Sequence, residues 1–297
     1  SSFIEAIATR IVSPSADRTE PFCDHFGTCG GCKWQHLDYA KQTQYKQQQV
    51  VDNLQRLGGL ALPEVTPILP SPTTTHYRNK LEFTFSNSRW FTREEIGTLG
   101  DTPDRNALGF HIPRRFDRVL DIHTCHLQPE PSNSIRNFFR AHARVHGLTF
   151  YDQREHVGFL RTLLIRTTTT GECMVLLAVG HEDVEARERI LSDLVARFPQ
   201  LTSVLWTVNP KKNDTIFDLD IHVFHGRDHL IEELPDGPGG RPLKFRIGPK
   251  TFFQTNPQQT IAMYRLTRDL AGLTGAENVY DLYCGAGSIT LYLAAKA

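Results

Sequence analysis

A short apolar stretch followed by a glycine turn, close to the end of the chain, constrains the fold more than any other feature. Residues 278–283 are expected to form a strand, residues 284–287 a tight turn of small residues, and Ser288 to begin a helix. Open α/β sheets bind ligands where such a strand ends, because glycines let the backbone approach the ligand and the start of the helix offers free amide donors. The sequence therefore predicts a site for a nucleotide-like group at this turn.

The turn differs from phosphate-binding loops, because it has neither the complete G-x-G-x-x-G pattern nor the lysine of a P-loop. The nucleoside part of S-adenosylmethionine carries no phosphate, and it suits such a turn better than ATP does. One strand and one helix cannot form a doubly wound sheet, and residues 291–297 have helical character without a stop signal. We therefore expect the chain to be truncated, with the polypeptide continuing beyond Ala297.

Three of the six cysteines, Cys23, Cys29 and Cys32, lie within ten residues of one another. Six cysteines are too few for a disulfide scaffold in a chain of 297 residues, and a crowd of thiols in a reducing cytosol usually binds metal. A fourth thiolate from Cys125 or Cys173 would complete the ligands of a zinc ion or an iron–sulfur cluster. Cys125 is the better candidate, because it lies in a loop-like stretch whereas Cys173 is expected to be a buried thiol in a hairpin strand.

The charge balance conceals two neighbouring segments of opposite sign. Thirty-three basic and thirty-three acidic residues sum to zero, which removes the simplest argument for a nucleic-acid partner. Residues 237–268 nevertheless hold six basic residues and no acidic one, whereas residues 214–236 hold seven carboxylates and one arginine. The basic segment can attract phosphates, although a solvated face beside an acidic neighbour explains it equally well.

The sequence contains neither a recognisable membrane-spanning segment nor a secretory signal peptide. No apolar run approaches the roughly eighteen residues of a membrane span, and the N-terminus lacks a basic stretch followed by an apolar one. We therefore expect a cytoplasmic protein with no membrane partner.

Periodic segments predict an α+β arrangement through the middle of the chain. Residues 3–12 alternate like the last strand of an upstream domain, and residues 80–85 also alternate. The other expected elements are a helix that Asp38 caps and Gly58 and Gly59 end, a helix beginning at Ser132 or Ser134 and reaching Gly147, a hairpin of residues 160–168 and 173–179, and a helix ending at Pro199. Further on, Asn256 and Pro257 are typical of a helix start, which alone would make residues 252–256 a helix boundary.

Five motifs resemble, in sequence and in order, the RNA uracil-5 methyltransferases, and specifically the iron–sulfur branch that modifies 23S ribosomal RNA. They are residues 23–32 (CDHFGTCGGC), 76–80 (HYRNK), 125–127 (CHL), 252–256 (FFQTN) and 281–287 (DLYCGAG). The resemblance implies an α+β central domain followed by the start of an α/β class I, Rossmann-like methyltransferase domain. The implied divisions are a remnant of an N-terminal β-barrel RNA-binding domain (1–20), the central iron–sulfur and RNA-binding domain (21–34 and 68–250) and an incomplete methyltransferase domain (35–67 and 251–297).

The resemblance also implies site residues. A 4Fe–4S cluster, serving as a structural element or an aid to RNA binding, would be held by Cys23, Cys29, Cys32 and Cys125. S-adenosylmethionine would lie against six residues, namely Gln254, Asp281, Tyr283, Gly285, Gly287 and Ser288. The candidates for holding RNA phosphates, ribosomal RNA being favoured over tRNA, are Arg78, Lys80, Lys244, Arg246 and Lys250.

In this family a cysteine thiolate adds to uracil C6, which makes C5 nucleophilic enough to attack the donor methyl group, and a general base then removes the C5 proton. The nucleophile and bases of the family follow the first glycine turn, so they are expected beyond residue 297, and the present sequence is not expected to catalyse alone. Cys284 is expected to pack within the turn and is rejected as the nucleophile. The alternatives are a noncatalytic metal-containing RNA-binding module and a zinc protein with an unrelated nucleotide site.

Overall fold

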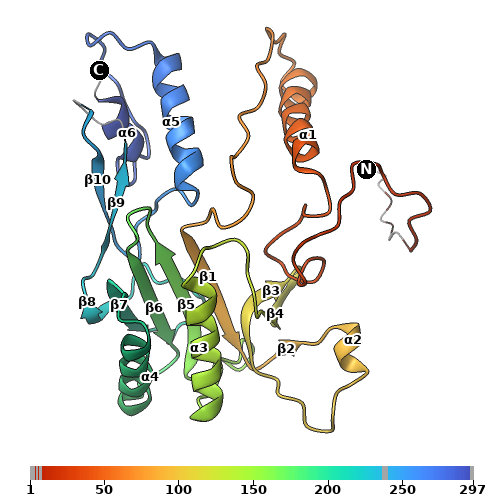
Figure 1. Ribbon diagram of the computed structural model, residues 1–297, viewed down its shortest axis with the longest axis vertical. Helices are drawn as coiled ribbons and strands as arrows, with labels where there is room; N and C mark the ends of the chain where they lie inside the picture. Colours follow the sequence, from red (N-terminus) through yellow and green to blue (C-terminus); the bar gives the residue numbers. More distant parts are fainter. Residues whose placement is uncertain (1–3, 5, 7–8, 236–239, 295–297) are drawn as a thin grey trace. The chain divides into compact units, whose positions relative to one another are not determined.

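The computed structural model describes residues 4, 6, 9–235 and 240–294, and its helices and strands are labelled in Figure 1. The chain divides into two compact units, one of residues 1–27 and 32–70 and the other of residues 28–31 and 71–297. Cys29 therefore belongs to the second unit, whereas Cys23 and Cys32 belong to the first. The domain boundaries expected from the sequence differ from these bounds and stay a prediction.

The first unit contains α1 (Tyr39–Asp52), which continues as a π-helical turn, η1 (Asn53–Leu57), and ends at Gly58. The side chain of Asp38 caps α1 by accepting the backbone N–H groups of Ala40 at 3.0 Å and Lys41 at 3.3 Å, which confirms the predicted start. Residues 3, 5, 7 and 8 of the strand predicted over residues 3–12 lie outside the described residues, and residues 4, 6 and 9–12 are in no strand. The β-barrel remnant to which this strand was assigned stays a prediction.

The second unit is built on a mixed sheet of eight strands in the order β2-β4-β3-β1-β5-β6-β7-β8 (Figure 1). Neighbouring strands are antiparallel except for β2 with β4 and β6 with β7. The strands are β1 (Lys80–Ser86), β2 (Arg89–Trp90), β3 (Ala107–Ile112), β4 (Arg115–Asp121), β5 (Leu160–Thr167), β6 (Cys173–Val179), β7 (Ser203–Val208) and β8 (His222–Gly226). The alternation at residues 80–85 and the hairpin of β5 and β6 are confirmed.

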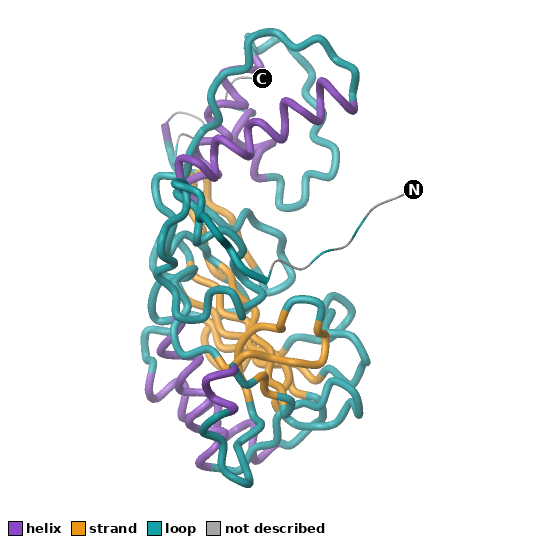
Figure 2. The backbone as a smooth tube through the Cα atoms, turned by 90° about the vertical axis from the view of Figure 1, so that its right-hand side faces the viewer, coloured by secondary structure: helices purple, strands orange, loops and turns teal. Residues whose placement is uncertain are grey.

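Helices α3 (Ser132–Val145) and α4 (Val184–Arg197) lie on one face of this sheet (Figure 2), and a short helix, α2 (Arg93–Ile96), follows β2. The main core lies beneath α3 and α4. Phe83 and Phe85 of β1 pack there with Phe139 of α3, and burying each such ring contributes about 2–3 kcal/mol. Both long helices confirm their predictions.

A smaller antiparallel sheet, β9 (Leu230–Leu234) with β10 (Leu243–Ile247), precedes helices α5 (Pro257–Ala271) and α6 (Ser288–Leu293). Their apolar residues form a separate core that includes Phe245, Phe253 and Tyr264. The strand predicted over residues 278–283 is not formed, because no described strand lies beside this segment to pair with its backbone groups. Among the described residues, no helix combines the length and apolar character that crossing a bilayer requires.

Candidate cofactor-binding site and cysteine cluster

The segment that contains Gln254 is held between the small core and the start of α5. Phe253 is buried with Phe245 in that core, whereas the preceding Phe252 is largely exposed. Asn256 caps α5, its side-chain oxygen accepting the Gln259 N–H at 3.1 Å, and Pro257 occupies the first helical position as predicted. The buried Phe253 on one side and the capping Asn256 on the other therefore fix where the backbone of Gln254 lies.

Asn79 joins this segment to the large sheet. Its side-chain Nδ2 donates to the Gln254 carbonyl oxygen at 3.0 Å, and its backbone N–H donates to the Thr255 carbonyl oxygen at 2.9 Å. On the other side, the Asn79 carbonyl oxygen accepts the Thr167 N–H at 2.9 Å at the end of β5. A single buried side chain thus connects two motifs that are far apart in the sequence, residues 76–80 and 252–256.

Replacing Asn79 with aspartate tests this connection. The aspartate has the same shape, but it presents an acceptor to the Gln254 carbonyl oxygen in a buried position, so we expect the free energy of unfolding to fall by about 1–3 kcal/mol. Urea denaturation measures the change. Asn79→Ala, which removes the donor without placing two acceptors together, should lose no more than Asn79→Asp. An aspartate variant as stable as the wild type would contradict the role of Asn79.

Two residues of the glycine turn, residues 284–287, adopt left-handed backbone conformations. Gly285 and Gly287 have φ of 56° and 69°, in the left-handed region that favours glycine. Tyr283 also has a positive φ, 65°, and its side chain is fully exposed. Cys284 is exposed as well, so the prediction that its thiol packs within the turn is wrong. The reason is that no described strand lies beside the turn to cover it.

The polar side chains around the turn are tied to α5 and α6. The Thr290 hydroxyl donates to Asp281, which links the start of the turn to α6. The hydroxyl groups of Ser288 and Tyr264 lie 2.6 Å apart, so Ser288 is bonded to the middle of α5. Because α5 begins at Pro257, three residues after Gln254, this helix connects the Gln254 segment to the residues of the turn.

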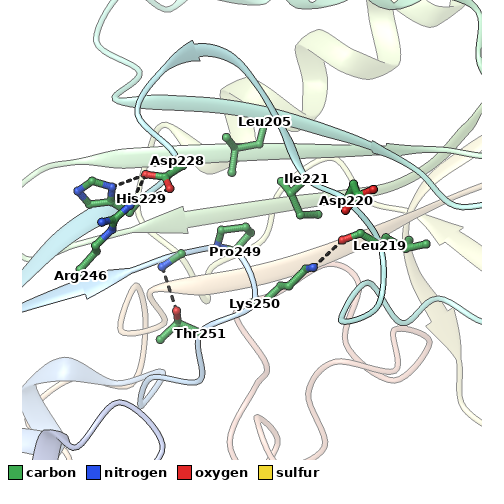
Figure 3. A pocket seen from close by; sticks show the side chains of 11 residues that line it. Leu205, Leu219, Asp220, Ile221, Asp228, His229, Arg246, Pro249, Lys250 and Thr251 are labelled. Atoms are coloured by element: carbon green, nitrogen blue, oxygen red, sulfur yellow. Dashed lines mark hydrogen bonds and ion pairs between the residues drawn. The ribbon is translucent and has the colours of Figure 1, made fainter.

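The predicted RNA-binding cations are paired with acidic or carbonyl groups. Lys244 lies 3.0 Å from Glu233, and Arg246 lies 2.8 Å from Asp228. Arg246 and Lys250 line a pocket of about 440 Å³ (Figure 3), where Lys250 donates to the Leu219 carbonyl oxygen. On the large sheet, Lys80 pairs with Glu82 at 2.8 Å and Arg78 Nε donates to the Lys80 carbonyl oxygen at 3.4 Å. The acidic segment thus neutralises part of the basic one.

The predicted cysteine ligands fall in both units. In the first unit, burial raises the pKa of the Cys23 thiol, with a smaller contribution from the negative charge of Cys32. In the second unit, Cys29 packs against the main core, to which the buried Cys125 belongs. A Cβ at Gly30 would lie 2.4 Å from a backbone oxygen of β3, so only glycine allows this close approach.

Two polar side chains surround Cys125. Asn133 accepts the Cys125 N–H at 2.8 Å and donates to its carbonyl oxygen at 3.1 Å, which fixes the backbone on both sides of the thiol. Arg136 is fully buried and donates to the Ile122 and His123 carbonyl oxygens, but its Nη1 has no hydrogen-bond partner within the described part of the chain. A buried cation with an unused donor next to a cysteine fits an anionic, thiolate-bound centre.

Comparison with known proteins shows what the whole chain is similar to, although no family model matches it. It is 48% identical to a Bacteroides thetaiotaomicron protein named an uncharacterized RNA methyltransferase, over 99% of this chain and 64% of the relative. A Porphyromonas gingivalis protein of the same name is also 48% identical, over 100% of this chain and 63% of the relative. The chain is similar to RNA methyltransferases. It spans less than two thirds of the length of these curated relatives.

The fold is also shared with a solved RNA methyltransferase. The crystal structure of Pyrococcus abyssi tRNA (uracil-54, C5)-methyltransferase in complex with S-adenosyl-L-homocysteine matches with a TM-score of 0.68 and 24% sequence identity. The match covers 96% of this chain and 58% of that chain. The α+β arrangement with its large mixed sheet is therefore a fold that an RNA methyltransferase uses.

Sequence reasoning missed Asn133 and Arg136, which surround Cys125, and missed the connecting role of Asn79. Asn79 belongs to the motif of residues 76–80, but its partner lies 175 positions away. Asn133 and Arg136 carry one weak signal, since both lie in the first turns of the helix that follows Cys125. Polar residues at such positions are usually solvated, so this signal would not have selected them.

Proposed function

We propose that the protein is an S-adenosylmethionine-dependent methyltransferase that acts in the cytoplasm on C5 of uridine in RNA, with 23S ribosomal RNA as its substrate. The observation that carries the proposal is the 48% identity, over nearly the whole chain, to proteins named RNA methyltransferases. The choice of uracil C5 is supported by the sequence motifs and by the shared fold, because the solved protein is a tRNA uracil C5 methyltransferase. The S-adenosylhomocysteine in that complex is what remains of the donor after methyl transfer.

The donor binds at the glycine turn in this proposal. Gly285 and Gly287, both in the left-handed region, have no side chains that would keep a ligand away from the backbone. Gln254, Tyr283 and Ser288 contact the donor, and Asp281 supports the turn through its hydrogen bond with Thr290. The α5 helix connects the Gln254 segment with Ser288, since it begins at Pro257, three residues after Gln254, and its Tyr264 hydroxyl is hydrogen-bonded to Ser288.

The methyl transfer requires covalent activation, because uracil C5 is a poor nucleophile. A cysteine thiolate adds to C6, the resulting enolate attacks the methyl group of the donor through C5, and loss of the C5 proton to a general base releases the cysteine. None of the six cysteines present is assigned this role. Four are proposed ligands, Cys284 belongs to the donor turn, and burial raises the pKa of Cys173 to about 12, so its thiol stays protonated.

A 4Fe–4S cluster, held by Cys23, Cys29, Cys32 and Cys125, is the second cofactor of the proposal. Four thiolates suit iron–sulfur clusters and zinc alike, and the resemblance of the motifs favours the cluster. The unpaired donor of the buried Arg136 next to Cys125 supports a negatively charged centre there. The cluster serves as a structural element or as an aid to RNA binding.

The RNA backbone is held by Arg78, Lys80, Lys244, Arg246 and Lys250. The carboxylates that now pair with Lys244 and Arg246 form exposed ion pairs, which stabilise a protein little. Phosphates can therefore replace them. The target uridine leaves its stack before it reacts, which costs least in a single-stranded loop.

Tritium release tests the proposed reaction, because methylation expels the hydrogen at C5. Full-length protein is incubated with S-adenosylmethionine and RNA transcribed with 5-tritiated uridine, using 23S ribosomal RNA and tRNA in separate reactions. We expect release from ribosomal RNA that requires the donor and that falls at least about tenfold in Gln254→Ala. Release from tRNA alone would overturn the ribosomal substrate, and RNA binding without release would favour a noncatalytic RNA-binding module.

A further inference from the structure

Three side chains that commonly bind metal ions lie together on helices α3 and α4. His142 and His146 are four residues apart at the end of α3, and Asp193 lies on α4. One ligand atom of each residue lies within 4.8 Å of the ligand atoms of the other two. His142 Nε2 is 2.9 Å from Asp193 Oδ2, and the centroids of the two imidazole rings are 4.3 Å apart. The cluster is separate from the cysteines and from the glycine turn.

The spacing suits a tetrahedral metal ion. Residues four apart face the same side of a helix, so two histidines there can bind one ion, as in helical His-x3-His motifs. Metal–ligand bonds of about 2.0–2.1 Å place tetrahedral ligand atoms roughly 3.3 Å apart. Small side-chain rotations bring separations between 2.9 and 4.8 Å to that value. Two imidazoles and one carboxylate favour zinc and its transition-metal neighbours over calcium or magnesium.

His142 is prepared for a ligand role by its surroundings. Its side chain is only 5% exposed, and its ring centroid lies 5.5 Å from that of Phe138. Its Nδ1 has no hydrogen-bond partner among the residues that the structure describes. His146 and Asp193 are exposed and leave room for a water molecule as the fourth ligand.

We propose that His142, His146 and Asp193 form a zinc site that links α3 to α4. The ion ties together the two helices that cover the large sheet, at the point where α3 ends. This inference is independent of the proposed methyltransferase reaction, because none of the three residues belongs to the donor turn, the cysteine ligands or the basic candidates.

Zinc titration of the full-length protein with its cysteine ligands already occupied by iron tests the site. We expect calorimetry to show one zinc per chain, and thermal unfolding to shift upward as zinc is added. X-ray absorption of the bound zinc should show nitrogen and oxygen neighbours at about 2.0 Å and no sulfur at about 2.3 Å. His146→Ala and Asp193→Asn should each weaken binding at least about tenfold.

His225→Ala is the matched control, because His225 is exposed in the same unit and belongs to no such cluster. It should bind zinc as the wild type does. Sulfur neighbours in the absorption spectrum would place the ion at the cysteines and overturn the proposal. Equal zinc affinity in the wild type and in His146→Ala would overturn it too, as would the absence of binding by the wild type. None of these results depends on tritium release, so the proposed zinc site and the proposed methyltransferase reaction can be contradicted separately.

Discussion

Replacing Cys125 with serine is expected to lower the iron content of the anaerobically purified, full-length protein from about four atoms per chain to fewer than one. A serine hydroxyl stays protonated at neutral pH and does not replace a soft thiolate ligand. The substituted residue should keep its position, because Asn133 bonds the backbone of residue 125 on both sides. Iron analysis and the visible absorbance of the brown protein measure the loss.

Cys173→Ser is the matched control for this experiment. Cys173 is buried in the same unit, but burial alone raises its pKa to about 12, so its thiol is protonated and unsuited to metal. The Cys173→Ser protein should therefore retain its iron. Iron retained in Cys125→Ser would remove Cys125 from the ligand set. A colourless wild-type protein with one zinc per chain, whose X-ray absorption shows sulfur neighbours at about 2.3 Å, would instead show that the four thiolates hold zinc.

Local patterns predicted the elements whose stability is local. The alternation of Leu81, Phe83 and Phe85 indicated β1, and the caps Asp38 and Asn256 marked the starts of α1 and α5. Both signals depend on residues within one or two turns of each other, so the rest of the chain does not change them.

Pairing between distant segments could not be predicted in this way. Residues 278–283 have the composition of a buried strand, yet without a described neighbour to pair with they form none. The parallel pairing of β2 with β4 and the edge position of β8 likewise depend on which strands meet, and no local pattern specifies that.

In the candidate site, too, some residues could be recognised from the sequence and others only from their distant partners. Cysteine spacing and the order of the motifs selected the residues proposed to hold cofactors, because soft ligands and glycine turns are recognisable from residue type. Asn79 and Arg136 are recognisable only through their partners, which are the backbone of Gln254 and the surroundings of Cys125. The ion pairs could be predicted in part. The opposite charges of neighbouring segments suggest pairing between them, as observed for Lys244 with Glu233 and for Arg246 with Asp228.

Replacing Arg161 with methionine should lower the free energy of unfolding by about 3–5 kcal/mol. Arg161 is fully buried on β5 and lies 4.3 Å above the ring of Tyr151. Its guanidinium donates to the Asn209 carbonyl oxygen at 2.6 Å, to the Asn213 carbonyl oxygen at 2.7 Å and to the Asp214 carboxylate at 3.0 Å. Methionine fills much of the same volume but leaves these buried acceptors without donors, so the loss reports mainly on the hydrogen bonds.

Arg189→Met provides the comparison, because Arg189 is exposed on α4 and makes one ion pair there, with Glu185. Its loss should cost about 0.5 kcal/mol or less in urea denaturation. The difference between the two variants then measures how strongly a single buried cation holds the loop of residues 209–214. That loop leads directly to Ile216 and Phe217, which line a pocket together with Lys250 and Phe252 next to Gln254. An Arg161→Met protein as stable as Arg189→Met would show that the loop is held by other contacts, and that the wall of this pocket does not depend on β5.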